Sequence, residues 1–235
     1  TSDQPMENIW EYRDLIFIKG GLLTIQVGLG SLVIATIFGL LGAWAKLTTN
    51  FLLNWLAMGY TTIIRGIPDL VLMLIIFFEG QIFLNFAGEW TGLWTYVEIS
   101  PLTAGIGTIG FIMGAYYTET FRGAFLSIPN GQIEAGIACG MSRPLIFRRI
   151  IWPQLVRYAL PSFTNNWLVQ LKTTALVSVI GLQDIVYNAN SIGRKLREPF
   201  TFLFAALLFY LVLTAVSEIV LRSMEKKYSA GVRRV

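Results

Sequence analysis

Five ionisable side chains interrupt long apolar stretches of this sequence, and they are its first candidates for chemistry. They are Arg65, Asp69, Glu79, Glu119 and Lys172. A charged group at the centre of a bilayer costs about 2.5–3.5 kcal/mol on insertion scales, so it usually has a partner or a task. Asp69 follows Pro68 in a stretch that Gly66 also interrupts, and broken helices often line transport sites. A carboxylate there suits a guanidinium or ammonium group and would repel an acidic substrate.

Structural roles compete with transport roles for these residues. Asp69 can instead pair with Arg65, four residues earlier, and both interpretations stay open. Glu119 lies three residues before Arg122 and is expected to pair with it. Lys172 is expected to bind a carboxylate of another span or the carbonyl groups of a helix end. The candidate substrate path, with helix packing as the alternative for its uncharged members, is Asp69, Arg65, Glu119, Tyr116, Asn166 and Lys172.

The residue types that are missing exclude several enzyme classes. The 235 residues contain no histidine and a single cysteine, Cys139. This excludes Ser-His-Asp triads, His-ligated zinc, disulfides within the chain and multi-thiolate metal sites. The glycine-rich P-loop pattern that holds ATP phosphates does not occur, so the chain is not expected to hydrolyse ATP alone. We therefore predict no catalytic residue, no metal site and no cofactor in this chain.

The composition indicates a membrane protein. Hydrophobic residues make up 54% of the chain and charged residues 14%, whereas about a quarter of an ordinary soluble domain is charged. A helix needs roughly 20 apolar residues to cross the hydrocarbon core. Five stretches of the sequence approach this length and predict five transmembrane helices. They lie at about 20–45, 55–79, 100–119, 160–182 and 199–221. We predict an all-α integral membrane fold with an extracytoplasmic segment 1–19, a transmembrane domain 20–225 and a cytoplasmic tail 226–235.

The basic residues predict the orientation, because lysine and arginine are enriched in cytoplasmic loops. With an outer N-terminus and an inner C-terminus, eleven of the 18 basic residues lie inside: Lys46, Arg122, Arg143, Arg148, Arg149, Arg157, Arg222, Lys226, Lys227, Arg233 and Arg234. The acidic loop 79–98 then lies outside. The cluster Arg194, Lys195 and Arg197 also lies outside, against the rule, and its role stays open. The net charge of +4 is thus explained by membrane topology, and no nucleic-acid partner is expected.

The inner loop at about 128–153 has the pattern of two short helices around a glycine. Residues 131–139 suit a helix with small side chains, and Gly140 can adopt a positive φ at little cost. Ser142 is a candidate N-cap for a second helix that Pro153 ends. Such a unit fits either a docking site for a partner protein or an amphipathic hairpin lying on lipid headgroups.

Within this loop, Glu134-Ala135-Gly136 is followed after three residues by Gly140, after nine more by Ile150, and then by Trp152-Pro153. The arrangement resembles the EAA loop of membrane subunits of binding-protein-dependent ABC importers, in which Ala stands in place of Gly136 and Leu in place of Trp152. Gly136 is expected to loosen its helix by up to about 1 kcal/mol relative to Ala. Three further segments are similar to the polar-amino-acid permeases of this group: RGIP at 65–68, GAY at 114–116 and KTTAL at 172–176.

The resemblance, over about residues 18–230, implies a type I ABC importer permease fold in the bacterial inner membrane. It implies four kinds of partner: a second permease subunit (a distinct M-type chain or another copy), two cytoplasmic ATPase subunits that bind ATP and Mg, a periplasmic binding protein, and membrane lipid. The residues it implies for ATPase docking are Glu134, Ala135, Gly136, Gly140, Arg143 and Arg148. The implied cargo is cationic amino acids (histidine, lysine, arginine and ornithine), with opines or other polar amino acids as the alternative. A passive channel or scaffold and a stand-alone membrane enzyme are the competing classes.

Overall fold

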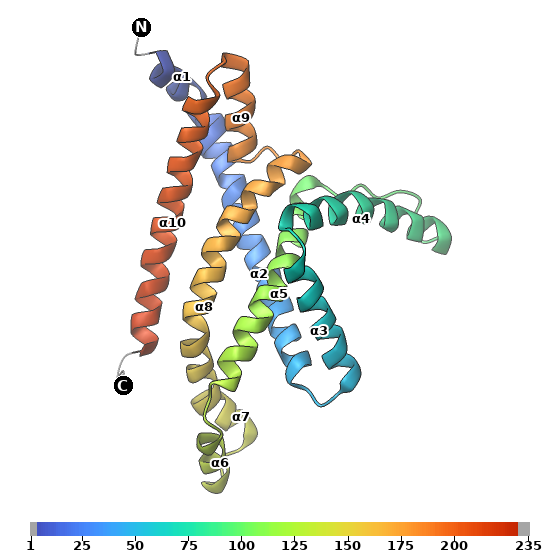
Figure 1. Ribbon diagram of the computed structural model, residues 1–235, viewed down its shortest axis with the longest axis vertical. Coiled ribbons are helices and arrows are strands. Elements are labelled where there is room, and N and C mark those ends of the chain that lie inside the picture. Colours follow the sequence, from blue (N-terminus) through green and yellow to red (C-terminus); the bar gives the residue numbers. More distant parts are fainter. Residues whose placement is uncertain (1–3, 230–235) are drawn as a thin grey trace.

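The computed structural model describes residues 4–229, and every regular element in that range is a helix. The first helices form one continuous rod, α1 (Gln4–Arg13), the π-helical segment η1 (Asp14–Gly20) and α2 (Gly21–Leu47). Three helices complete the first half: α3 (Phe51–Gly66), α4 (Asp69–Thr91) and α5 (Pro101–Leu126). The second half contains α6 (Asn130–Ala138), α7 (Arg143–Ile146), η2 (Phe147–Ile151), α8 (Trp152–Thr173), the 3-10 segment η3 (Thr174–Ile180), α9 (Ile185–Leu196) and α10 (Pro199–Ser229). Figure 1 shows α2, α5, α8 and α10 as long, neighbouring rods.

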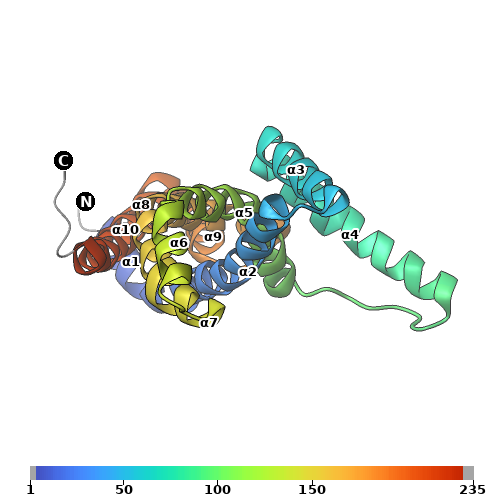
Figure 2. The same cartoon turned by 90° about the horizontal axis from the view of Figure 1, so that it is seen from below.

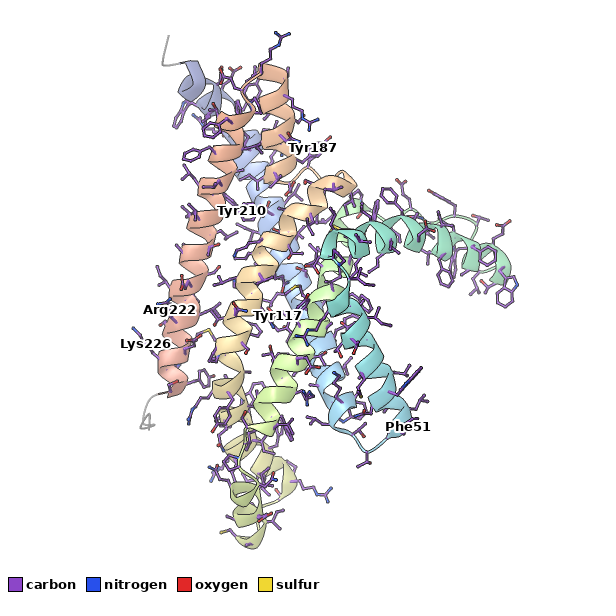
Figure 3. All side chains as sticks on the ribbon, viewed as in Figure 1. Phe51, Tyr117, Tyr187, Tyr210, Arg222 and Lys226 are labelled. Atoms are coloured by element: carbon purple, nitrogen blue, oxygen red, sulfur yellow. The ribbon has the colours of Figure 1, made fainter. Side chains whose placement is uncertain are left out.

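The centre of the fold is the seam between α2 and α5. Glycines let these helices approach closely, as small residues do in membrane helix pairs. A Cβ added at Gly39 would lie 2.6 Å from the Cβ of Tyr117, and one at Gly110 would lie 2.5 Å from Ile34. Figure 3 shows Tyr117 in the middle of the bundle, where it is fully buried. The core then extends over buried residues of α2, α4, α5 and η3: Val27, Ala35, Met73, Ile109, Met113, Val177 and Ile180.

The interruption expected at Gly66 and Pro68 within the predicted span 55–79 is present, because the chain breaks there into α3 and α4, and α4 continues to Thr91. Pro68 lacks a backbone N–H, and the residue before a proline is pushed out of the helical region. Ile67 accordingly has φ −113° and ψ 140°, which is extended backbone. Beyond the break α4 turns sharply away from α3, which Figures 1 and 2 both show.

By length and composition, three helical stretches of the described residues could cross a membrane. They are Asn8–Leu47, Asp69–Thr91 and Pro199–Ser229, and the pair Arg143–Ile180 with Ile185–Leu196, bent by 53°, would add a fourth. Helix α5 is not among them, since its glycine, threonine and tyrosine residues lower its mean hydropathy. The count of five transmembrane helices therefore stays a prediction.

The proposed domain limits have no visible break in the structure. Segment 1–19 is helical from Gln4 and runs through η1 directly into α2. It packs on α9 and α10, where Ile16, Ile185 and Phe202 form a buried cluster. At the other end, α10 continues to Ser229. The rest of the predicted tail, including Arg233 and Arg234, lies outside the described residues.

The corner between α9 and α10 carries the basic cluster of residues 194–197. Gly193 allows the corner to close, since a Cβ there would lie 2.8 Å from the Cα of Pro199. Arg197 takes the left-handed conformation at φ 59°. Arg194, Lys195 and Arg197 are all exposed. Figure 1 shows this corner near α1, at the end of the molecule opposite to α6 and α7.

Candidate functional site

A polar pocket opens where α3 ends, between α2, α3 and α5. Its volume is about 450 Å³, and its lining residues are Lys46, Thr61, Thr62, Arg65, Gly66, Tyr116 and Glu119. Arg65 and Gly66, in the last turn of α3 before the break at Pro68, line this space. Three residues of the predicted substrate path, Arg65, Tyr116 and Glu119, are therefore brought together by helices far apart in sequence.

Arg65 stacks on Tyr116 and is not paired with Asp69. Its guanidinium carbon lies 5.4 Å from the centroid of the Tyr116 ring, within the range of a cation–π contact. Among residues 4–229, the Asp69 carboxylate lies within 4.0 Å of no basic nitrogen. Asp69 stands in the first turn of α4, and Tyr116 lies within electrostatic range of both Asp69 and Arg65. The Tyr116 ring and the Arg65 guanidinium thus line the pocket together, whereas Asp69 is not among its lining residues.

Helix α3 is held against α5 by a second tyrosine. The Tyr60 hydroxyl donates to the backbone carbonyl of Phe111 over 2.5 Å. The two rings lie 5.0 Å apart, and Phe38 of α2 packs on both of them. Tyr60 directly precedes Thr61, which lines the pocket, so this contact holds the α3 wall of the pocket against α5.

Glu119 is the centre of an ion-pair cluster. The expected pair with Arg122 is confirmed, with 3.0 Å between Arg122 Nη2 and Glu119 Oε2. Lys46, at the end of α2, pairs with the other carboxylate oxygen. The sequence interpretation missed Lys46, whose only signal was a positive charge at the end of a predicted span. This cluster links the C-terminal parts of α2 and α5.

Besides Asp69, two more predicted path residues are absent from the lining of the pocket. Asn166 donates to the hydroxyl of Thr120 over 3.0 Å, which joins α8 to α5. Lys172 is exposed and lines a different cavity, of about 310 Å³, between α8, η3, α9 and α10. The structure therefore does not bring Asn166 or Lys172 to the pocket. No group of three or more His, Cys, Asp or Glu residues within 4–229 is placed to hold a metal ion.

The loop with the EAA-like pattern forms a compact hairpin of α6, α7 and η2, which we call the coupling hairpin. It ends α6 with Gly140 at φ 74°, and the Met141 N–H donates to the carbonyl of Gly136 over 3.0 Å. Gly136 is buried, and a Cβ there would lie 2.9 Å from Cδ1 of Ile150. The glycine that departs from the EAA pattern thus allows α6 to lie close to η2.

The coupling hairpin presents its remaining motif residues outward. Glu134, Ala135, Gly140, Arg143 and Arg148 are exposed, and Ile137 is 62% exposed. Figure 2 views the molecule from this end, with α6 and α7 in front of the bundle. An exposed hairpin with a hydrophobic side chain and flanking charges is suited to contact another protein.

A bundle of apolar helices, with an exposed hairpin at one end and a polar pocket beside a broken helix, is the architecture expected of a membrane transport subunit. Comparison with known families agrees: residues 35–230 match the family described as "Binding-protein-dependent transport system inner membrane component". The chain belongs to this family and is a membrane permease subunit.

Several relatives are similar over almost the whole chain. The histidine/lysine/arginine/ornithine transport system permease protein HisQ of Escherichia coli (strain K12) is 50% identical over 93% of this chain and 96% of its own. The octopine transport system permease protein OccQ of Rhizobium radiobacter is 39% identical over 96% and 94%. The arginine ABC transporter permease protein ArtQ of Haemophilus influenzae (strain ATCC 51907 / DSM 11121 / KW20 / Rd) is 32% identical over 96% and 98%.

Solved structures agree with the fold. A crystal structure of an amino acid ABC transporter with histidines superposes with a TM-score of 0.77 at 28% identity, covering 93% of this chain and 96% of that one. An inward-facing structure of the MetNI methionine ABC transporter superposes with a TM-score of 0.70 at 17% identity, covering 91% and 96%. The second likeness concerns the fold alone.

Proposed function

We propose that this permease carries cationic amino acids such as histidine, lysine, arginine and ornithine into the cell. The observation that carries the proposal is the Asp69 carboxylate, which lies at the α3–α4 break without a basic partner within 4.0 Å among residues 4–229. A carboxylate in that environment favours a guanidinium or ammonium group. The name of the HisQ relative, which lists four such amino acids, supports the same cargo.

The pocket supplies the other contacts that a cationic amino acid needs. Arg65 is exposed beside it, and a guanidinium binds an α-carboxylate in bidentate geometry. The ring of Tyr116 offers a surface for an alkyl or imidazole side chain. In this arrangement Arg65 holds the backbone carboxylate of the cargo and Asp69 its cationic end.

Transport is driven by partner subunits. In the proposed complex, this chain pairs with a second permease, of M-type or identical to it, and two ATPase subunits dock on the coupling hairpins. ATP and Mg bind to those ATPases, and a periplasmic binding protein delivers the cargo from the other side. The N-terminus is then periplasmic and the C-terminus cytoplasmic. Support comes from the placement of α6 and α7 at the end opposite α1 (Figure 1).

Exchanging the Asp69 carboxylate for an amide tests the cargo. In proteoliposomes with the partner subunits, Asp69→Asn should lower arginine and lysine uptake at least about tenfold, the loss expected when a charged hydrogen-bond partner worth 1.5–3 kcal/mol is removed. Basal ATP turnover and assembly should not change. Glu79→Gln is the matched control, because Glu79 is an exposed carboxylate on the same helix, ten residues beyond Asp69 and away from the α3–α4 break.

Full uptake by Asp69→Asn would exclude Asp69 as a cargo ligand. The OccQ and NocQ relatives named for octopine and nopaline, at 39% and 38% identity, make opines the second candidate cargo. Competition of each opine against labelled arginine separates the two cargo classes. Uptake without ATP would instead indicate the passive channel.

A further inference from the structure

A second polar cavity lies between α8 and α10, on the outside of the bundle and separate from the pocket of α2, α3 and α5. It has a volume of about 460 Å³ and is lined by Arg157, Pro161, Arg222, Glu225, Lys226 and Ser229. Figure 3 labels Arg222 and Lys226 on the C-terminal part of α10, toward the end that carries the coupling hairpin. Nothing in the transport mechanism uses these residues.

The cavity has an excess of positive charge. Three cations and one carboxylate line it. Glu225 accepts a hydrogen bond from the Thr164 hydroxyl over 2.8 Å, and Arg222 pairs with Glu218, one turn earlier on α10. Within the part of the chain that is described, neither Arg157 nor Lys226 has a carboxylate within 4.0 Å. Two cations are thus left to meet an anion from outside the chain.

An apolar surface continues from these cations along α10. Residues seven apart lie on the same helix face, two turns from each other. Ile219 and Val212, seven and fourteen residues before Lys226, therefore share its face of α10. Both are strongly exposed, at 71% and 64%. This face of α10 is therefore cationic at its C-terminal end and apolar toward its N-terminal end. A lipid, which has a charged headgroup and apolar chains, matches both parts.

We infer that this cavity binds the phosphate headgroup of an anionic membrane phospholipid. Arg157 and Lys226 hold the phosphate oxygens, and the acyl chains lie along Val212 and Ile219. Basic pockets between membrane helices at the bilayer surface are suited to such headgroups. Free inorganic phosphate has the same charged oxygens as the headgroup, but it has no acyl chains to contact the apolar surface. The assignment does not depend on the amino acid carried.

Lipid retention tests the assignment. The purified complex is placed in nanodiscs of equal phosphatidylglycerol and phosphatidylcholine, and retained lipid is counted by native mass spectrometry. Retained phosphatidylglycerol should fall about fivefold in Arg157→Gln and in Lys226→Gln. This is the change in lipid affinity expected when one cation near a membrane surface is lost. Glu225→Gln, which removes a negative charge and keeps an oxygen for Thr164, should raise retention by a similar factor.

Lys227→Gln is the matched control. Lys227 is exposed and adjacent to Lys226 but does not line the cavity, so its loss should leave retention unchanged. An equal fall in Lys227→Gln and Lys226→Gln would overturn the site in favour of diffuse charge attraction. Equal retention of both lipids by the unaltered chain would also overturn it. Saturable binding of inorganic phosphate in phosphatidylcholine discs, lost in Lys226→Gln while phosphatidylglycerol retention stays unchanged, would overturn the lipid as occupant.

Discussion

Two carboxylates of the predicted substrate path differ in their surroundings: Glu119 lines the pocket, and Asp69 stands in the first turn of α4, after the break. Glu119 already accepts from Lys46 and Arg122, so a cationic ligand would have to displace a cation of the protein. Asp69 has no basic partner within 4.0 Å among residues 4–229. Glu119 therefore connects α2 to α5, and Asp69 is the carboxylate that we propose as the ligand of the cargo.

The pairing of Glu119 with Lys46 predicts non-additive stability. Side-chain exposure is 22% for Glu119 and 12% for Lys46, so each single change leaves a partly buried charge without its partner. Glu119→Gln and Lys46→Gln should each lower the free energy of unfolding by about 1–3 kcal/mol. The loss of unfolding free energy in the double variant should be clearly smaller than the sum of the two single losses, because the effects of changing two residues in contact are not additive. Denaturant titration in micelles measures all four proteins, and strict additivity would contradict the pairing.

Local sequence rules predicted only part of the site. The Glu119–Arg122 pair follows from a spacing of three on a helix, and it is present. The Lys46 partner lies 73 residues away in sequence, and no local pattern links the two. Likewise, Asn166 was predicted to line the substrate path because it is polar. Only the packing of α8 on α5 shows that its amide donates a hydrogen bond to Thr120.

At the level of helices, the position of the α3–α4 break was predictable and its direction was not. Gly66 and Pro68 indicate an interruption from chemistry alone. The turn of α4 away from α3 depends on long-range contacts such as Met73 with the α5 core, which no local window contains. For the same reason, the sequence interpretation joined the two helices into one span.

The coupling hairpin depends on the left-handed residue at its turn. Gly140 has φ 74°, and an Ala there costs about 1–2 kcal/mol, since its Cβ meets the following carbonyl oxygen. In Gly140→Ala we expect binding-protein-stimulated ATP turnover to fall severalfold, because α6 no longer meets η2 at the same angle. Gly131→Ala is the control: an added Cβ there meets nothing within 4 Å, and it should be neutral. Equal turnover in both variants would contradict the role of the turn.

At the level of the whole molecule, the coupling hairpin and the α9–α10 corner lie at opposite ends (Figure 1). The single cysteine makes this arrangement testable, since Cys139 is exposed on the hairpin. A membrane-impermeant maleimide should label Cys139 in inverted vesicles and not in sealed right-side-out ones. Bound ATPase subunits should slow the labelling.

A cysteine placed on the opposite side of the membrane should give the reverse labelling pattern and so test the same orientation. In Cys139→Ser with Thr95→Cys, an exposed position of the loop after α4, only right-side-out vesicles should react. Labelling of Cys139 from the outer side would contradict the predicted topology.

The open space at Gly66 has a consequence for how such a permease changes its cargo. An added Cβ at Gly66 meets nothing within 4 Å, whereas one at Gly39 or Gly110 collides with the neighbouring helix. Gly66 lines the pocket, and the α2–α5 seam does not depend on it. New side chains can therefore be tried at Gly66 at little cost in folding. A side chain introduced at Gly66 should therefore alter the cargo and leave assembly intact, whereas one introduced at Gly39 or Gly110 should disrupt assembly first.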